Sequence, residues 1–366
     1  MNPYDFVRLP ERVDRKRVIA HEKLGLKCGS IRCRLTAITP ILVPANQGRV
    51  GTQRFLSYRY LGAELPAIPG SSLKGVIRGV AEAASLSCIG LSAELFFYDR
   101  GISKLNVSEG YRQGINREMV TCNSTDRLCP ACRLFGMVSS RSHYLGKVSI
   151  GEARTTPEKF KHGSQIILKP LMEPKPRHTA FYLPHEKVAG RKFYFHHTGP
   201  PRITTQATEY TRTVIPLEGL DQSGNPRTIF EFDVMFTNLA DDEYSLLLFS
   251  LFLTENMRHK VGGGKPNGLG TSKIECASLR LIDPKQRYSR LTPGVGARSL
   301  EGQELSGHIQ KATTAITSNP SLSVVDLERI WRYPPARSAD GRPVEYQYPD
   351  QEWFAKNSDV PLSGTP

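Results

Sequence analysis

The chain has 366 residues, of which 39% are hydrophobic and 23% charged, as is usual for a globular protein with a full core. No apolar run reaches transmembrane length, which argues against a membrane-spanning protein. The 49 lysine and arginine residues against 35 acidic residues give a net charge of +14, which favours a polyanionic partner. Nucleic acid is the first candidate and an anionic membrane surface the second.

The N-terminus shows no signal-peptide pattern. Seven cysteines without such a signal indicate a reducing compartment. We therefore expect a cytoplasmic protein with no membrane partner, whose cysteines are free thiols or metal ligands rather than disulfides.

The first part of the chain divides into an arm, a strand and a long connection. Residues 1–27 contain prolines and a basic cluster, and we expect an irregular arm. Residues 31–38 alternate between apolar and mostly basic side chains, which predicts a half-buried strand with a basic outer side. The connection 45–66 interleaves cations with aromatic rings, an arrangement that suits single-stranded nucleic acid, although a loop containing a strand is the alternative. These residues are Arg49, Arg54 and Arg59 with Phe55, Tyr58 and Tyr60.

A helix is predicted to begin after Pro69 and Gly70, with Ser71 or Ser72 as its cap. Apolar residues recur at helical spacing from Leu73 to Ala84 and predict one buried face.

A second face of this helix carries two cations, Lys74 and Arg78, one turn apart. Gly75 and Gly79 leave the neighbourhood free of side chains, so a ligand can approach the backbone. An RNA phosphate suits such a helix start. The alternative is a capped core helix with solvated cations.

Four cysteines predict a metal centre. Cys129-Pro-Ala-Cys132 can hold one tetrahedral ion, and Cys122 can add a third thiolate from the same loop. Cys88 is our preferred fourth ligand, and His143 is the alternative. We expect structural Zn²⁺, with a redox pair or coincidental core cysteines as the other interpretations. The remaining cysteines, Cys28, Cys33 and Cys276, are expected to be small buried residues.

A second strand and helix follow at residues 229–257, and a glycine-rich loop at 262–270 precedes a strand at 271–281. We therefore predict an α+β fold of ferredoxin-like type with helices on one face of the sheet. The expected organisation is 28–90 for the first strand and central helix, 91–145 for an insertion with the cysteines, 146–228 for an irregular insertion, and 229–282 for the second unit. Residues 283–366 are expected to be a loosely attached extension with one short helix at 324–331.

Taken in order, these features resemble the RAMP superfamily of CRISPR-associated proteins. The marks are Ile-Pro-Gly-Ser-Ser-Leu-Lys-Gly at 68–75, the glycine-rich loop with its following strand, and the repeated strand and helix. Further marks resemble a type III subgroup, namely Asn-Pro-Tyr-Asp-Phe-Val at 2–7, Cys-Pro-Ala-Cys-Arg-Leu-Phe-Gly at 129–136 and Arg-Lys-Phe-Tyr at 191–194. The resemblance covers about residues 2–282.

The resemblance implies a RAMP fold of the RNA-recognition type within 1–282. It also implies a backbone subunit that binds CRISPR RNA, aligns target RNA and contacts other subunits of an effector complex. The implied RNA contacts are Ser71, Ser72, Lys74 and Arg78, together with the loop around Lys265 and Asn267.

Target-cutting members of the family carry an acidic residue, usually Asp, between the first strand and the central helix. This chain has no Asp or Glu between Glu22 and Glu64, so we expect it to bind RNA without cutting it, and we assign no catalytic residue. The alternative is an endoribonuclease acting on target RNA, with Glu64 or Asp5 as a substitute, or on the CRISPR precursor, with His21 or His143 as the base.

Overall fold

The computed structural model describes residues 2–19, 21, 25–45, 51–60, 62–90, 113–139, 142–170, 178–290, 292, 294–337, 341 and 344–362. The candidate RNA contact Arg49 and much of the insertion at 91–145 lie outside the described residues. In the described part of the chain, no helix combines the length and the apolar character that crossing a bilayer requires.

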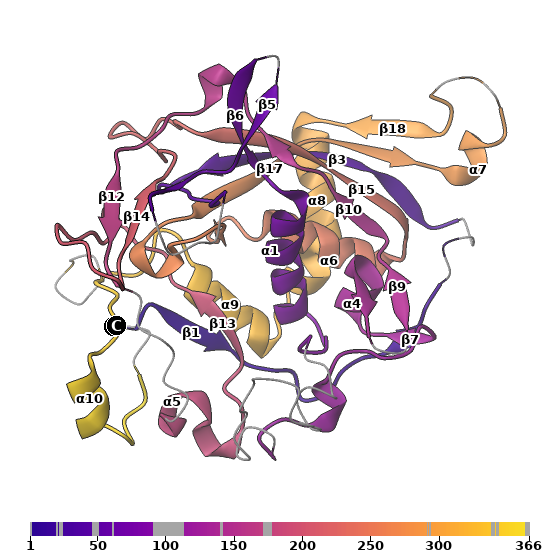
Figure 1. Cartoon of the computed structure of the whole chain (residues 1–366). Coiled ribbons are helices and arrows are strands. Elements are labelled where there is room, and N and C mark those ends of the chain that lie inside the picture. Colours follow the sequence, from indigo (N-terminus) through magenta and orange to yellow (C-terminus); the bar gives the residue numbers. More distant parts are fainter. Residues whose placement is uncertain are drawn as a thin grey trace.

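The centre of the molecule is an antiparallel sheet with the order β17-β3-β15-β11, in which β10 also pairs with β15. The chain passes from β3 through α1 to β10 and β11, and from β15 through α6 to β17 (Figure 1). This is the split βαβ arrangement, and it confirms the predicted α+β fold. The bounds are β3 Lys27–Ala37, β10 Val148–Ile150, β11 Ala153–Arg154, β15 Ile229–Leu239 and β17 Thr271–Ile282.

The sheet is extended at both edges. On one side β6 (Ala63–Ile68) pairs with β11, and β5 (Ser57–Tyr60) forms a hairpin with β6 at the top of Figure 1. On the other side β16 (His259–Lys260) and β18 (Ala297–Leu300) pair with β17.

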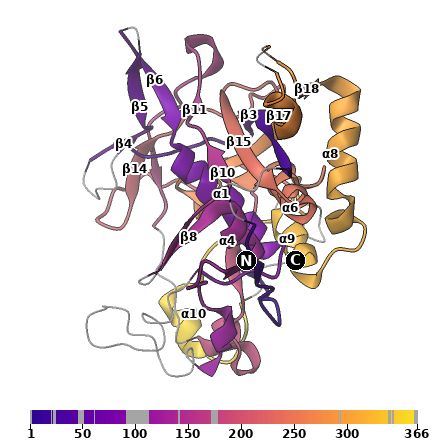
Figure 2. The same cartoon turned by 90° about the vertical axis from the view of Figure 1, so that its right-hand side faces the viewer.

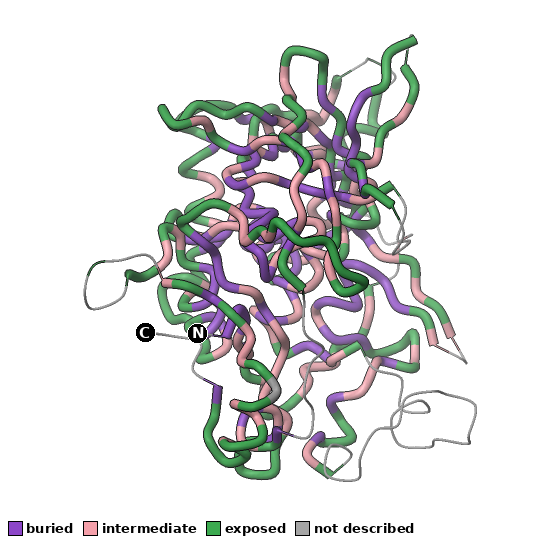
Figure 3. The backbone as a smooth tube through the Cα atoms, turned by 60° about the vertical axis from the view of Figure 1, so that its left-hand side comes forward, coloured by how far each residue is buried: buried purple, intermediate pink, exposed green. Residues whose placement is uncertain are grey.

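Two helices, α1 (Gly70–Ala83) and α6 (Asp241–Phe252), pack on one face of the sheet. The inward side chains of β3 are buried, as the alternation predicts, whereas Arg32 and Arg34 are exposed on the other face. Figure 3 shows the buried backbone concentrated at the centre of the molecule.

The N-terminal arm corrects one prediction. Residues 4–7 form β1 (Tyr4–Val7), which pairs antiparallel with β13 (Arg191–Tyr194). Tyr4 and Val7 are completely buried. The aromatic ring of Tyr4 packs among other rings, and this contact with a segment distant in sequence outweighs the prolines and charges of the arm.

The C-terminal segment also differs from the loose extension that we predicted. Helix α8 (Gly302–Thr317) packs on α6, and α9 (Leu322–Trp331) covers β1 and β13. Leu327 and Trp331 of α9 are buried at 0% and 4% exposure, so this segment completes an apolar core. Figure 2 shows α8 and the β5–β6 hairpin at opposite sides of the molecule.

The remaining elements are short and connect these layers. Three of them, β12, β13 and β14, lie in the stretch 146–228 that we expected to be irregular. The short strands are β2 Lys16–Arg17, β4 Gln53–Arg54, β7 Arg127–Leu128, β8 Gly136–Val138, β9 His143–Leu145, β12 Ile166–Leu168 and β14 Arg212–Ile215. The short helices are η1 Arg117–Met119, α4 Pro130–Phe135, η2 Pro157–Lys159, α5 Thr179–Tyr182, η3 Pro184–Glu186, η4 Lys265–Asn267, α7 Pro284–Arg287 and α10 Gln351–Lys356.

Candidate metal centre and nucleic-acid interface

The four predicted metal ligands meet at one point in the structure. The Sγ atoms of Cys88, Cys122, Cys129 and Cys132 all lie within 4.8 Å of one another, and all four residues are buried. Cys88 follows α1, Cys122 lies in the loop before β7, and Cys129 and Cys132 bracket the first turn of α4. His143, the alternative ligand, is exposed on β9 and is not in this cluster.

The distances between sulfur atoms fit a tetrahedral ion. Cys88 Sγ lies 3.7 Å from Cys132 Sγ and 3.6 Å from Cys129 Sγ. A Zn–S bond of about 2.3 Å places two sulfurs of a tetrahedron about 3.8 Å apart. The S–S bond of a disulfide is about 2.05 Å, and all four thiols are free. The cluster therefore has the donor set and the spacing of a structural metal site.

The thiols also perturb one another. Hydrogen bonds from Cys122, Cys132 and Cys88 lower the pKa of Cys129, whereas the same network raises the pKa of Cys132. The backbone N–H of Cys129 donates to Cys122 Sγ at 3.3 Å. One thiolate is thus stabilised by its neighbours, and a bound cation is what would allow all four to ionise.

The helix that carries two of the cysteines is fixed to α6 by a buried ionic group. Arg133 of α4 lies 3.2 Å from Oε1 of Glu243, and Lys147 Nζ lies 3.0 Å from Oε2. The side chains of Lys147 and Glu243 are 0% and 1% exposed. These contacts connect the cysteine cluster rigidly to the main sheet and its helices.

A groove of about 570 Å³ runs beside α1, between that helix and the β8–β9 hairpin. Lys74 and Arg78 line it, and the space around Gly75 and Gly79 is open, as predicted. Burial and the charge of Arg78 lower the pKa of Lys74, and Lys74 makes no ion pair with any described residue.

The groove has polar and apolar walls. The hydroxyls of Thr121 and Tyr144 are buried there and have no hydrogen-bond partner among the described residues. Val138 and Leu145 of the hairpin are 80% and 79% exposed at its rim. The groove can therefore accept a ligand that combines an anion with a less polar part, and a nucleotide is such a ligand.

Arg78 is held more tightly than the sequence suggested. Its guanidinium donates to Glu82 Oε1 at 2.8 Å, to the Gly136 carbonyl at 2.9 Å and to Cys132 Sγ at 3.7 Å. Burial lowers the pKa of Arg78, but the hydrogen bond and charge of Glu82, with the thiols of Cys132 and Cys88, give a net rise. Glu82 stands four residues after Arg78, which is the sequence signal for this pair.

The start of α1 differs from the prediction in one detail. The cap position is Pro69, and no side chain caps the helix, so Ser71 and Ser72 are exposed rather than bonded to the first turn. A Cβ at Gly70 would lie 2.2 Å from the Ile150 carbonyl oxygen, so the backbone packs too closely for any other residue. The two hydroxyls remain available to a ligand.

The described part of the basic and aromatic connection forms β4, in a separate small sheet, and β5, at the edge of the main sheet. Arg54 is exposed on β4, and Tyr60 on β5 is 55% exposed. The guanidinium of Arg154 lies over the ring of Tyr58 at 5.5 Å. Tyr58 of the hairpin therefore lies near a cation, whereas Phe55, another aromatic residue of the predicted interface, is buried at 4% exposure and stacks on Phe230.

The glycine-rich loop is more enclosed than expected. Asn267 is 3% exposed, and its Nδ2 donates to the Lys169 carbonyl, which leaves it a structural role in this conformation. Burial lowers the pKa of Lys265. His196 and His197 are buried beside this loop, and the ring of His196 forms hydrogen bonds with Thr271 Oγ1 and the Arg258 carbonyl.

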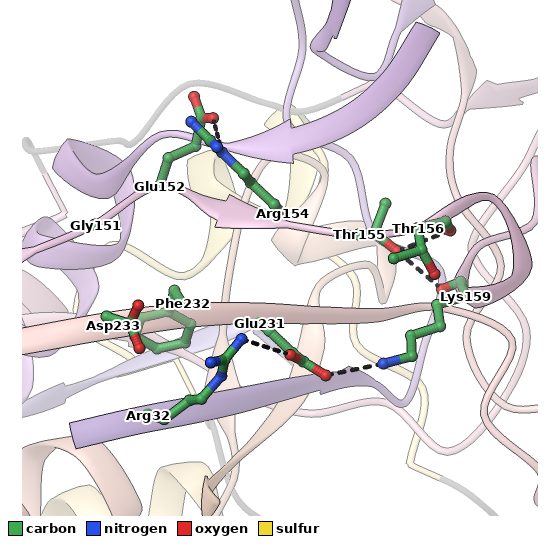
Figure 4. A pocket seen from close by; sticks show the side chains of 10 residues that line it. All are labelled: Arg32, Gly151, Glu152, Arg154, Thr155, Thr156, Lys159, Glu231, Phe232 and Asp233. Carbon is green, nitrogen blue, oxygen red and sulfur yellow. Dashed lines mark hydrogen bonds and ion pairs between the residues drawn. The ribbon is translucent and has the colours of Figure 1, made fainter. Parts of the chain in front are cut away.

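A second pocket, of about 380 Å³, lies on the opposite face of the sheet (Figure 4). Glu231 there accepts from Arg32 at 3.3 Å and from Lys159 at 2.9 Å, and Arg154 pairs with Glu152 at 3.0 Å. Because these cations are paired internally, this pocket is a weaker phosphate site than the groove beside α1.

The comparisons with known proteins point to one family. The model of the RAMP superfamily matches residues 34–273. Among solved structures, the crystal structure of Thermofilum pendens Csc2 is similar with 13% identity over 86% of this chain and 90% of that chain, at a TM-score of 0.35. A chain of a type IV-B CRISPR complex is similar with 13% identity over 72% of this chain and 95% of that chain, also at 0.35. No curated protein matches the chain.

Proposed function

The chain belongs to the RAMP superfamily, and we propose that it is an RNA-binding subunit of a CRISPR effector complex that holds guide RNA and aligns target RNA. The sequence marks at 2–7, 129–136 and 191–194 favour a type III complex. The observation that carries the proposal is the groove beside α1, which Lys74 lines without an ion pair to any described residue, while the helix surface at Gly75 and Gly79 is open. The net charge of +14 supports a polyanionic ligand.

We propose that the RNA backbone enters this groove and that its bases extend towards the β5–β6 hairpin. Lys74 supplies charge for a phosphate, and the exposed hydroxyls of Ser71 and Ser72 supply hydrogen bonds.

The chain binds RNA without cutting it in this proposal. Asp5, one conceivable acid, lies 2.9 Å from Arg329 in an ion pair. Glu64, the other, is exposed on β6 directly opposite Arg59. The proton-accepting groups that in-line cleavage needs are therefore replaced in the connection by cations, which bind phosphate but do not act as bases.

The test is a titration of fluorescently labelled single-stranded RNA at several salt concentrations. Lys74→Ala should weaken binding and reduce the magnitude of the salt slope by about 0.7, because one phosphate contact is lost. Lys159→Ala is the matched control, because that lysine is paired with Glu231 on the opposite face and its loss should leave binding within about twofold. Equal binding by Lys74→Ala and the parent at every salt concentration would show that this face of α1 is structural.

We further propose that the four cysteines bind structural Zn²⁺, which joins the end of α1 to α4. Zinc binding contributes folding free energy locally. Cys129→Ser should therefore increase hydrogen exchange in 113–136, whereas Cys276→Ser, outside the cluster, should not. Elemental analysis of protein purified without chelator should give one zinc per chain, and the absence of any stoichiometric metal would refute the site.

A further inference from the structure

The thiol cluster and the groove beside α1 share one side chain. Arg78 lines the groove, and its Nη2 also donates to Cys132 Sγ at 3.7 Å. Its Nε and Nη1 are held by Glu82 and by the Gly136 carbonyl. A guanidinium has five N–H groups, so at least two are left for a ligand in the groove.

A second arginine approaches the cluster from β13. Arg191 Nη2 donates to the carbonyls of Ser87 and Cys88, at 3.0 and 2.6 Å. Arg191 Nε lies 3.8 Å from Oε2 of Glu82, the carboxylate that also binds Arg78. Glu82 therefore orients both guanidinium groups beside the thiols.

The charges give a reason for two partly buried arginines beside the thiols. Four thiolates around a divalent cation would carry a net charge of −2, and Arg78 in contact with Cys132 Sγ, with Arg191 nearby, would offset it. Hydrogen bonds of this kind to metal ligands fix the ligand orientation and tune affinity for the metal. The sequence alone did not link the cysteines to α1, because the contact joins residues 78 and 132.

We propose that Arg78 couples metal binding at the four cysteines to RNA binding in the groove. The metal-bound thiolates hold Arg78 in one orientation, with its free N–H groups directed at the RNA backbone, so that each ligand raises affinity for the other. This inference rests on the proposed function and adds a regulatory consequence, namely that loss of the metal weakens RNA binding through this side chain. Arg78 is a positioning residue for the metal and a contact for the RNA.

The experiment is a thermodynamic cycle on the full chain. RNA affinity is measured for zinc-loaded and chelator-stripped protein, in the parent and in Arg78→Met and Arg78→Lys. Affinity for Co²⁺ is measured separately by its thiolate charge-transfer absorption. In the parent, stripping should weaken RNA binding by at least fivefold, which is the lower end of usual coupling between sites. In Arg78→Met, Co²⁺ affinity should fall about 10- to 100-fold. Removal of zinc by chelator should then weaken the RNA binding of this variant less than twofold.

Lys74→Met is the matched control, since Lys74 lies one turn away in the same groove and has no contact with the cysteines. It should weaken RNA binding but leave Co²⁺ affinity as in the parent. Removal of the metal should reduce its RNA affinity by the same factor as in the parent. Arg78→Lys should keep part of the RNA affinity and lose the Co²⁺ effect, because an ammonium lacks the fork that spans Glu82 and Cys132.

The outcomes separate the two claims. If the zinc-loaded parent binds no RNA, the proposed function fails and the coupling fails with it. If the parent binds RNA and stripping weakens Arg78→Met as much as the parent, the function stands and the coupling through Arg78 is refuted. Unchanged Co²⁺ affinity in Arg78→Met also refutes it, whatever the RNA result.

Discussion

Lys147 and Glu243 form an ion pair inside the protein, with 3.0 Å between Nζ and Oε2 and almost no exposure of either side chain. Arg133 joins the same carboxylate at 3.2 Å. Glu243 thus bridges two cations, and Arg133 also pairs with Asp242 at 3.1 Å, so that these contacts hold α4 and its two cysteines against the start of α6. A buried charge left alone is costly, so the group must act as a unit.

Glu243→Gln should lower the free energy of unfolding by about 3–5 kcal/mol, because it leaves the buried Lys147 without its acidic partner, whereas Arg133 keeps Asp242. Denaturant unfolding followed by fluorescence measures this. Asp241→Asn is the control, because its ion pair with Lys27 is exposed and should be worth less than about 1 kcal/mol. Equal stability of the two variants would contradict this assignment.

The buried side chain of Lys260 should make the free energy of unfolding depend on pH. It is completely buried, burial lowers its pKa to about 7, and its Nζ donates to the Leu269 carbonyl. Lys265, His196 and His197 face it, and all four groups are cations when protonated. In the unfolded chain a lysine keeps its proton to about pH 10.4, so the unfolded state binds more protons above pH 7. Stability from this group therefore rises as the pH increases from 7 towards 10.

The measurement is the free energy of unfolding at pH 7, 8 and 9. Parent protein should gain about 2 kcal/mol more between pH 7 and 9 than Lys260→Met does, at up to about 1.4 kcal/mol per pH unit. Lys285→Met, an exposed lysine of α7, should follow the parent. Parallel curves for the parent and Lys260→Met would contradict the shift.

The C-terminal helix α9 should contribute to global stability. Trp331 packs edge-to-face on Phe193 of β13, with 5.1 Å between ring centroids. Trp331→Ala should cost about 3–5 kcal/mol, because it opens a large cavity. Leu322→Ala in the same helix should cost under about 0.5 kcal/mol, since Leu322 is 63% exposed. A small effect of Trp331→Ala would restore the interpretation of a loose extension.

RNA assembled with the purified chain should remain uncut. Guide and labelled target RNA are incubated with the protein, with and without Mg²⁺, and we expect no site-specific product, because the one carboxylate of the connection before α1, Glu64, stands directly opposite Arg59. Cleavage that persists when every partner is inactivated, and disappears in Glu64→Ala, would establish the endoribonuclease alternative.

Local sequence patterns predicted the α+β fold and the cysteine cluster. The alternation at 31–38 and 230–236 and the helix at 70–83 depend on neighbouring residues, and the structure confirms them. The cysteine spacing likewise predicts a cluster that depends mainly on one loop. Strand β1 was not predicted because its partner β13 is far away in the sequence, at Arg191–Tyr194.

The errors share a physical cause, which is long-range packing. Asn267 looked available on a glycine-rich loop, but the Lys169 carbonyl from another segment uses its amide. Arg78 was predicted to be a cation free to contact RNA, or a solvated one as the alternative, whereas it also donates to Gly136 and Cys132 of the cysteine segment. The composition of the C-terminal segment predicted a loosely attached extension. Its few apolar residues are nevertheless placed so that they cover β1 and β13.

The central claim is that RNA lies in the groove beside α1. Ultraviolet crosslinking of the full chain to single-stranded RNA, followed by mass spectrometry of the peptides, tests it directly. We predict nucleotide adducts on the peptides that contain Lys74 and Tyr144, which both line the groove, and their loss in Lys74→Ala. Adducts confined to the opposite face of the sheet, on the peptides that contain Arg32 or Lys159, would contradict the account.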